Sequence, residues 1–372
     1  MKILYSCLSK SWGGMEMYTL TSVRQLLSKN VHVEILCLKN STLYNEAMQM
    51  GVVAHTIGSA GYLNLRGIFK IISLLNNKNI DLIHTQASRD LWLLVPALKL
   101  QNSKIPLVFT KQVGSFIIKK DFLHKIIYNR ISVAFAISNV IRKNLVETTT
   151  LQPGKILLVH NCIEINKFNP QKTNRSVIRK EFDVANDDIL IGMMARFSPG
   201  KGHEEFLLAM KKLKEKYTNL KFMIVGKASY GEEKYEKEIK LLASELMKQE
   251  IIFTGFRKDT ADILSAMDIF VFPSHAEAFG ISLIEAMAME LPTVSSNADG
   301  VLDITVDGVT GFLFENKNTN DLSEKISKLL DAKELRVKMG KTGRQRVLDK
   351  FNLEKQTETI LEIYSSLISK TK

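Results

Sequence analysis

Short apolar runs alternate with longer amphipathic stretches along most of the chain. In the first half the runs are KILYSCL, VHVEILCL, DLIHT, PLVFT, SVAFAIS and KILLVH, and stretches such as GMEMYTLTSVRQLLSKN separate them. Apolar runs of this length are typical of buried strands, and a helix between consecutive strands makes those strands parallel. The pattern therefore predicts an α/β fold built on parallel sheets.

A polar segment without strand character, FNPQKTNRSVIRKEFDVANDD at residues 168–188, interrupts this alternation. The alternation restarts with DILIGMMARF, KFMIVGK, IIFTGF, DIFVFPS, PTVSS and GFLF. A chain of 372 residues is also long enough for two domains. We predict two Rossmann-like domains, residues 1–168 and 169–352, that face each other across a cleft.

The last part of the chain predicts a helix over residues 353–370. Its sequence, NLEKQTETILEIYSSLIS, repeats apolar positions at helical spacing, so that they form one stripe. The stripe consists of Leu353, Thr357, Ile360, Leu361, Tyr364 and Leu367. We expect this helix to pack back near the N-terminal domain.

The composition is that of a globular protein, with 45% hydrophobic and 24% charged residues. The longest uncharged run, near LWLLVPAL, is about half of the roughly 20 residues that a membrane span needs. The N-terminal MKILYSCLSK has no small-residue cleavage site and predicts a first strand rather than a signal peptide. Cys7, Cys37 and Cys162 show no metal-ligand spacing and are expected to be buried, reduced thiols. These features predict a cytoplasmic protein.

Positive charge is concentrated in the first half of the chain. Residues 1–185 carry 24 Lys and Arg against 10 Asp and Glu, whereas residues 186–372 carry 27 against 29. Such an asymmetry indicates an acidic partner of the first half, for which nucleic acid, an anionic membrane surface and a phosphorylated acceptor are the candidates. A role in solubility alone is the alternative.

The loops after the strands hold two candidate anion sites, because open parallel sheets bind ligands at the carboxyl ends of their strands. SKSWGGMEMY places Gly13 and Gly14 directly before a helix, although a tight structural turn would use the same residues. ARFSPGKGHEEF places Arg196 and Lys201 around a turn that opens another helix, and two cations at a helix start suit a diphosphate. The spacing is not that of a P-loop. A solvated loop with two charges is the alternative.

The stretch SHAEAFGISLIEAMAMELP holds two carboxylates in apolar surroundings. Glu277 falls in a loop and Glu285 inside a helix, about 10 Å apart and too far for a glycosidase pair. Between them, the N–H groups of Gly280, Ile281 and Ser282 form a helix N-terminus that suits phosphate. The order carboxylate, anion site, carboxylate matches the hydroxyl, diphosphate and ribose of a nucleotide sugar. Two acids on a solvated helix face would be the alternative.

Five motifs in order, GGMEMY, ARFSPGKGH, FTGF, PSHAEAFGISLIEAMAMELP and DGVTGFLF, carry a resemblance to a known family. The chain resembles family 4 of the retaining GT-B glycosyltransferases over nearly its whole length. The resemblance implies sugar transfer from a nucleotide-diphosphate sugar to a hydroxyl with retention at the anomeric carbon. It also implies no cofactor and no metal, since Arg196 and Lys201 can neutralise the leaving diphosphate.

The resemblance assigns residues to the two substrates. The catalytic group is Arg196, Lys201 and Glu277. The donor-binding group is Gly13, Gly14, Gly226, Phe256, Phe279, Gly280, Ile281, Ser282 and Glu285.

The acceptor side departs from the family pattern. Many members carry a histidine after the fifth strand, where this chain has FTKQVGS with Lys111 and Gln112. Gln112 can hydrogen-bond a sugar but cannot titrate, and Lys111 could serve an anionic acceptor. His84, at the end of DLIHT, is a further acceptor-side candidate, although a strand-end histidine is also typical of a structural role.

Segment 115–131, SFIIKKDFLHKIIYNRI, combines apolar and basic residues. It could lie on an anionic membrane or be an ordinary helix with a basic outer face. We therefore expect a glycan or lipid-linked acceptor, in surface polysaccharide or lipopolysaccharide synthesis, and peripheral contact of the basic domain with the inner face of the membrane. The alternatives are a GT-B-fold sugar-nucleotide epimerase or hydrolase and, less favoured, a nucleic-acid-binding protein. Nucleic-acid binding would predict stacking aromatic residues among the basic ones. Trp12 and Trp92 stand apart in the sequence, so no nucleic acid is expected.

Overall fold

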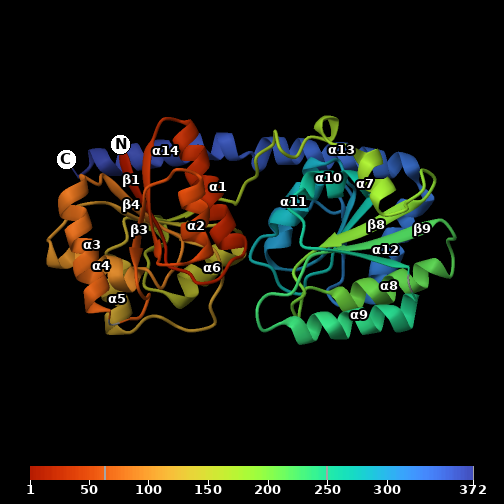
Figure 1. Ribbon diagram of the computed structural model, residues 1–372, viewed down its shortest axis with the longest axis horizontal. Helices are drawn as coiled ribbons and strands as arrows, with labels where there is room; N and C mark the ends of the chain where they lie inside the picture. Colours follow the sequence, from red (N-terminus) through yellow and green to blue (C-terminus); the bar gives the residue numbers. More distant parts are fainter. Residues whose placement is uncertain (63, 249, 372) are drawn as a thin grey trace. The chain divides into compact units, whose positions relative to one another are not determined.

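The chain divides into two compact units in the computed structural model, which describes residues 1–62, 64–248 and 250–371 (Figure 1). Unit 1 comprises Met1–His160 and Leu353–Lys372, and unit 2 comprises Asn161–Asn352. The change of unit falls before residue 168, and the polar segment 168–188 lies within unit 2. There it forms the short helices η2 (Pro170–Lys172) and α7 (Arg175–Glu181).

Unit 1 is built on a seven-stranded parallel sheet with the order β3-β2-β1-β4-β5-β6-β7. The strands are β1 (Lys2–Cys7), β2 (His32–Leu38), β3 (Ala54–Ile57), β4 (Leu82–Thr85), β5 (Leu107–Lys111), β6 (Val133–Ala136) and β7 (Ile156–Leu158). The helices are α1 (Gly14–Ser28), α2 (Thr42–Gln49), α3 (Leu65–Lys78), α4 (Leu91–Leu100), α5 (Phe122–Asn129), α6 (Asn139–Thr148), η1 (Pro153–Lys155) and α14 (Leu353–Ser369). Six of these strands follow the apolar runs, and β3 was not predicted because it is short, half-buried and partly polar.

The last helix belongs to unit 1, where it lies against α1 (Figure 1). Its Tyr364 is fully buried among core residues of the sheet and of α1, including Tyr5, Val23 and Phe135. The helix begins at Leu353 and turns its apolar stripe toward this unit. Burial of each large side chain of the stripe stabilises this packing by about 1.5–3 kcal/mol.

Unit 2 is built on a six-stranded parallel sheet with the order β10-β9-β8-β11-β12-β13. The strands are β8 (Ile189–Met194), β9 (Leu220–Val225), β10 (Ile251–Gly255), β11 (Ile269–Phe272), β12 (Thr293–Ser296) and β13 (Phe312–Phe314). The helices are α8 (His203–Lys214), α9 (Glu233–Met247), α10 (Thr260–Ala266), α11 (Ile281–Ala288), η3 (Asp299–Asp303), α12 (Thr319–Asp331) and α13 (Lys333–Lys350). The prediction of two Rossmann-like, parallel-sheet α/β domains is confirmed.

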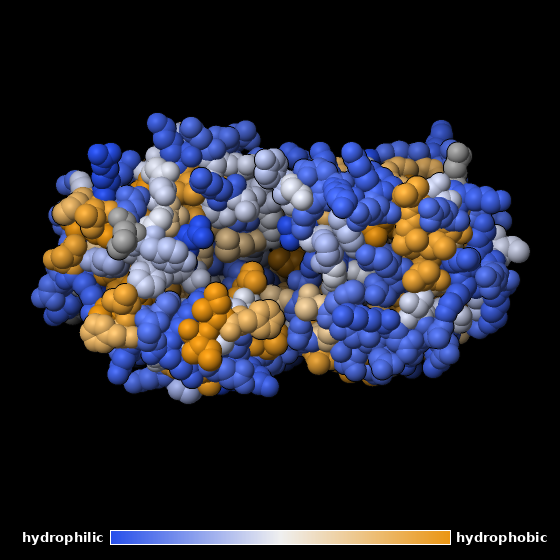
Figure 2. Space-filling view, turned by 90° about the horizontal axis from the view of Figure 1, so that it is seen from below, coloured by the Kyte–Doolittle hydropathy of each residue, from blue (hydrophilic) through white to orange (hydrophobic). Residues whose placement is uncertain are grey.

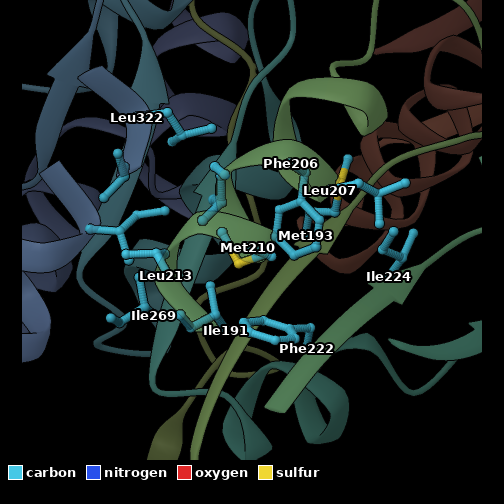
Figure 3. Packing of buried hydrophobic residues seen from close by; sticks show 14 of the residues in the cluster. Ile191, Met193, Phe206, Leu207, Met210, Leu213, Phe222, Ile224, Ile269 and Leu322 are labelled. Atoms are coloured by element: carbon cyan, nitrogen blue, oxygen red, sulfur yellow. The ribbon is translucent and has the colours of Figure 1, made fainter. Parts of the chain in front are cut away.

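The core of unit 2 fixes the start of α8 over the sheet (Figure 3). Phe206 and Met210 of α8 pack on Ile191 and Met193 of β8, and all four are fully buried. Large side chains at helical spacing thereby cover one face of β8. These contacts fix the position of the helix that follows the SPGKG loop over the sheet.

Each sheet has one point where the strand order reverses, between β1 and β4 in unit 1 and between β8 and β11 in unit 2. Loops that leave neighbouring strands in opposite directions open a crevice at such a point, where α/β proteins bind ligands. Most of the predicted site residues follow these four strands. Within the described residues, no helix combines the length and the apolar character that a membrane span requires.

Candidate active site

In unit 2 the loops after β8 and β11 contact each other directly. The N–H of His275 donates to the carbonyl of Gly200 at 2.9 Å. Gly202 has a φ of +77°, and a Cβ there would lie 2.2 Å from the carbonyl oxygen of Pro273. Only glycine fits this close approach. The two loops are therefore one structural unit, although Gly202 and Pro273 are far apart in sequence.

This contact brings Lys201 and Glu277 together. The ammonium of Lys201 donates to Glu277 Oε2 at 2.6 Å, and the two side chains are 22% and 21% exposed. The backbone of Glu277 is held from the other side, since its carbonyl accepts from Gly300 N at 2.9 Å. The pair thus has a fixed backbone and reaches solvent, where a ligand can contact both charges.

The helix α11 begins beside this ion pair. Gly280 caps it in the left-handed region, with a φ of 118°, and no side chain caps its first N–H groups. Ser282 Oγ donates to the carbonyl of Met194 at 3.1 Å, which ties the first turn of α11 to the end of β8. A helix start of this kind carries free N–H groups and partial positive charge. Its position after Glu277 is the one that the sequence predicts.

The structure places the Phe279 side chain in the core, away from a ligand. It is 2% exposed and packs edge-on against Phe351, with ring centroids 5.6 Å apart. The AFG sequence needs this aromatic ring to anchor the loop before α11. The Phe279 side chain is therefore not accessible to a donor, contrary to the donor-binding role predicted for it.

Glu285 lies one and a half turns into α11 and is half-buried. Burial raises the pKa of its carboxyl to about 7, and the charge of Lys167 opposes this rise. A carboxyl group whose pKa is raised by desolvation in this way is typical of a ligand-binding position. Near neutral pH it exists in both protonation states.

The remaining donor-side residues of unit 2 lie at neighbouring strand ends. Arg196 follows β8, is exposed, and donates to Ser229 Oγ at 2.9 Å. Gly226 follows β9 with a φ of +148°, and a Cβ there would lie 1.9 Å from the carbonyl oxygen of Ala195. Phe256 follows β10 and is 55% exposed. Three adjacent parallel strands thus deliver these residues to the same edge of the sheet.

In unit 1, Gly13 and Gly14 stand at the start of α1. The N–H of Gly13 donates to Glu16 Oε2 at 2.9 Å, so this donor has a partner within the chain. A Cβ on Gly14 would meet nothing within 4 Å. An anion could approach Gly14 freely, whereas at Gly13 it would compete with the buried carboxylate of Glu16.

Lys111 and Gln112 end β5 and are both buried. Gln112 Nε2 donates to Gln86 Oε1 at 2.7 Å, and Gln86 Nε2 donates in turn to the Tyr5 hydroxyl at 2.5 Å. Burial, together with the nearby charge of Lys119, lowers the pKa of Lys111 to about 8. A lysine that is costly to keep charged would be stabilised by an anionic ligand.

His84, an acceptor-side candidate, is a core residue. It is 1% exposed, its Nε2 pairs with Thr110 Oγ1 at 2.7 Å, and its Nδ1 pairs with the Tyr364 hydroxyl. Burial lowers its pKa to about 3, which keeps the ring neutral. The structure corrects this candidate, because α14 covers the ring and leaves no acceptor contact. The sequence could not reveal this, since His84 and Tyr364 are distant in the chain.

Asp90, whose carboxylate contacts both strands at the crevice of unit 1, was not identified from the sequence. It is fully buried and accepts from Ser6 Oγ at 2.7 Å, Thr85 Oγ1 at 3.0 Å and Leu8 N at 3.1 Å. Burial raises its pKa to about 6. The carboxylate ties the ends of β1 and β4 together. A signal was available, since Asp is a frequent residue at a helix start and Asp90 directly precedes α4.

The described part of the chain contains no group of three His, Cys, Asp or Glu side chains placed to hold a metal ion. The predicted site residues near α11 that carry charge are Arg196, Lys201, Glu277 and Glu285.

Solved structures with the same fold cover almost the whole chain. A glycosyltransferase from Rickettsia africae matches with a TM-score of 0.89 and 24% identity over 99% of this chain and 98% of that one. Anabaena Alr3699/HepE, solved in complex with UDP and glucose, matches with a TM-score of 0.84 and 21% identity over 98% and 100%. Two parallel-sheet Rossmann-like domains in one chain are the architecture of the GT-B class, to which these structures belong.

Two family models then match consecutive parts of the sequence. The Glycosyltransferase Family 4 model matches residues 12–167, and the Glycosyl transferases group 1 model matches residues 174–346. The second range contains Arg196, Lys201, Glu277 and Glu285. The chain belongs to family 4 of the glycosyltransferases.

Curated relatives match at slightly higher identity over smaller parts of the chain. The capsular polysaccharide biosynthesis glycosyltransferase CapM of Staphylococcus aureus is 28% identical over 63% of this chain, which spans 62% of that protein. The N,N'-diacetylbacillosaminyl-diphospho-undecaprenol alpha-1,3-N-acetylgalactosaminyltransferase of Campylobacter jejuni is 26% identical over 77% of both chains. Such relatives are glycosyltransferases of capsular or lipid-linked polysaccharide synthesis.

Proposed function

We propose that the protein transfers a sugar from a nucleotide-diphosphate sugar to a hydroxyl of a glycan or lipid-linked acceptor, with retention at the anomeric carbon and without a metal ion. The observation that carries the proposal is the Lys201–Glu277 ion pair directly before the free N-terminus of α11, with the half-buried Glu285 further along the same helix.

The donor occupies this sequence of groups in order. The diphosphate binds the N–H groups at Gly280, Ile281 and Ser282, and Arg196 and Lys201 complement its charge. The ammonium of Lys201 has three donors and can keep its bond to Glu277 while it contacts phosphate. Glu277 accepts from hydroxyls of the transferred sugar, and Glu285 accepts from the ribose.

The chemistry follows from the charge on the leaving group. The bond between the anomeric carbon and the phosphate oxygen breaks, and negative charge grows on the nucleoside diphosphate. Arg196, Lys201 and the start of α11 stabilise that charge more in the transition state than in the bound donor. The acceptor oxygen bonds to the anomeric carbon from the face that the phosphate leaves, and the phosphate takes its proton. Retention then needs no nucleophilic side chain.

The acceptor class is proposed from the relatives and from the charge of unit 1. The Campylobacter jejuni relative is named for a diphospho-undecaprenol substrate, and the Staphylococcus aureus relative for capsular polysaccharide biosynthesis. An excess of positive charge in residues 1–185 supports an anionic, membrane-borne acceptor. We propose a role in surface polysaccharide synthesis, in peripheral contact with the inner face of the cytoplasmic membrane.

A thermal-shift screen of nucleoside diphosphates and nucleotide sugars tests the donor assignment. A donor at 100 times its Kd should stabilise the protein by about 2.7 kcal/mol, and Glu285→Ala should reduce the shift. The selected donor is then incubated alone and with polyprenyl-diphosphate sugars in excess EDTA, with NMR of the anomeric proton as the readout. Transfer with retention supports the proposal. No nucleotide binding at all, conversion of the donor without an acceptor, or activity that needs added magnesium would contradict it.

A further inference from the structure

A cavity that none of the predicted donor residues lines lies within unit 1. It has a volume of about 210 Å³ and is lined by Tyr62, Ser88, Arg89, Trp92, Lys119, His124, Ile127 and Tyr128. These residues come from the segments that follow β3, β4 and β5. The cavity therefore opens at the carboxyl edge of the sheet, beside the crevice where α/β proteins bind ligands.

Aromatic rings form the walls of this cavity. Trp92 meets the Tyr62 ring edge-on with centroids 5.3 Å apart, and it meets the His124 ring edge-on at 5.1 Å. His124 in turn stacks on Tyr128 at 6.3 Å and pairs with Asp121, which caps α5. Rings that brace one another lose little freedom when a ligand binds. Such walls suit the apolar face of a sugar ring, with polar edges for its hydroxyls.

Two cations stand among the rings. The guanidinium of Arg89 lies 5.9 Å from the centre of the Tyr62 ring, and Lys119 forms another part of the wall. Burial lowers the pKa of Lys119, and its charge in turn disfavours the charge of Lys111 at the end of β5. None of the described residues that line the cavity is a carboxylate. An anion in this cavity would relieve the repulsion between the two lysines.

Exposed apolar side chains flank Lys119 of the cavity in the chain, just before α5 and at its first residue. Phe116 is fully exposed, and Ile117, Ile118 and Phe122 are each about seven-tenths exposed. In Figure 1, α5 lies at the lower edge of unit 1, and Figure 2, seen from below, shows patches of apolar surface on that unit. Several large apolar side chains left in water close together in the chain indicate a binding surface. We call these four residues the apolar rim.

We propose that the cavity binds the diphosphate and the first sugar of a polyprenyl-diphosphate-linked acceptor, and that the apolar rim contacts its lipid chain. Arg89 and Lys119 would hold the diphosphate, and Trp92 and Tyr62 would contact the sugar. This inference rests on the proposed function and specifies its acceptor. One ligand with a sugar, an anion and a hydrocarbon chain accounts for the rings, the cations and the rim together. A bilayer surface alone would leave the aromatic cavity without a role.

Trp92 makes the inference measurable by fluorescence. It lines the same cavity as Arg89 and Lys119, so a diphosphate bound to these cations changes its surroundings even without a sugar, and the chain has only one other tryptophan. In a Trp12→Phe background, farnesyl diphosphate is titrated against Trp92 emission, with farnesol and inorganic pyrophosphate as partial ligands. We expect saturable binding of farnesyl diphosphate that is at least tenfold tighter than binding of either partial ligand, since each contributes only one of the two contacts.

Substitutions separate the cavity from general charge. Arg89→Gln and Lys119→Gln should each weaken farnesyl diphosphate binding about tenfold. Lys120→Gln is the matched control, because Lys120 is the exposed neighbour of Lys119 and does not line the cavity. The rim variant Phe116→Ser/Ile118→Ser should weaken binding of farnesyl diphosphate and leave that of pyrophosphate unchanged. The rim side chains are exposed, so this variant tests the proposal even if a cavity variant folds poorly.

Donor binding measured on the same variants distinguishes the two proposals. Intact nucleotide-sugar binding with no response of Trp92 to farnesyl diphosphate would overturn the acceptor site and leave the proposed function standing. Equal effects of Lys119→Gln and Lys120→Gln would also overturn it. So would an equal response to phosphatidylglycerol vesicles or to single-stranded RNA, which would indicate a general anion surface. Absence of nucleotide binding would instead count against the proposed function.

Discussion

Arg196 and Lys201 stand at the carboxyl end of β8 as two differently held cations. Lys201 is paired with Glu277 at 2.6 Å, whereas Arg196 is exposed and bonded to the neutral Ser229. Both meet a diphosphate in the proposed donor complex, where charge grows during the reaction. Their contribution should therefore appear in turnover rather than in donor affinity.

We expect Arg196→Ala and Lys201→Ala each to lower kcat about 100-fold with a smaller effect on donor Kd, by analogy with the loss of one oxyanion donor. Steady-state kinetics and donor titration on the same preparations measure the two effects. Lys211→Ala, on the exposed face of α8, is the control and should keep the wild-type kcat. Unchanged turnover in both site variants would contradict the assignment.

Glu285 should give the proposed donor site a pH dependence. Burial raises its pKa to about 7, and the ionised form is the better acceptor for ribose hydroxyls. The ionised fraction rises from about a tenth at pH 6 to about nine-tenths at pH 8. Affinity for a nucleotide sugar should rise up to about tenfold over this range, and Glu285→Gln should flatten the profile. Calorimetric titration at several pH values checks this, and a parallel rise in the variant would refute it.

The same carboxyl also affects folding stability, which it lowers as the pH rises, whereas donor affinity should rise. Its folded pKa lies above the ordinary value of 4.5, so the folded state binds more protons between these values. Its contribution to the free energy of unfolding is therefore present at low pH and is lost as pH rises through about 7.

At the scale of elements, glycine contacts hold the strand-end loops together. A Cβ on Gly226 would lie 1.9 Å from the carbonyl oxygen of Ala195, and a Cβ on Gly202 would lie 2.2 Å from that of Pro273. Both clashes are with backbone, so no rotamer change relieves them. The close packing of the loops after β8, β9 and β11 depends on these two positions.

We expect Gly226→Ala to destabilise unit 2 by about 2 kcal/mol or more and to weaken donor binding, because the left-handed φ of +148° and the clash act together. Thermal unfolding with and without nucleotide measures both effects. Gly154→Ala, in η1, is the control, since a Cβ there meets nothing within 4 Å. Equal melting temperatures of the two variants would show that the loops adapt freely.

At the scale of the whole molecule, charge is divided between the two halves of the chain. The excess of Lys and Arg lies in residues 1–185, whereas residues 186–372 are nearly balanced. Each Lys or Arg near an anionic bilayer contributes on the order of 1 kcal/mol to the free energy of membrane binding. This attraction fades within a Debye length of roughly 8 Å at physiological salt. The excess in residues 1–185, most of which belong to unit 1, supports the proposed contact with an anionic membrane.

Co-sedimentation with liposomes tests that contact. The wild type should bind anionic liposomes at low salt and less at high salt, whereas Lys119→Glu/Lys120→Glu/Lys125→Glu should lose most of the binding. Neutral liposomes serve as the control. If the protein ignores anionic liposomes at low salt, or the variant binds equally well, the basic surface only solvates the domain and a soluble acceptor is favoured.

The sequence by itself determined the two-domain α/β architecture and all the strands except β3, and it placed the start of α11. Buried parallel strands must be apolar throughout, so runs such as DIFVFPS are visible without a structure, and a glycine before a helix marks the N-terminus of α11. The edge strand β3 was missed because its residues are only half-buried and carry little apolar signal.

Only the tertiary structure decided which side chains meet. The Lys201–Glu277 ion pair joins loops that are distant in sequence. The hydrogen bond between His84 and Tyr364 likewise joins the N-terminal sheet to the last helix. The cavity around Trp92 likewise combines segments after three different strands. Periodicity reports whether a residue faces the core, but contacts across the sheet depend on strand order, and strand order leaves no local mark on the sequence.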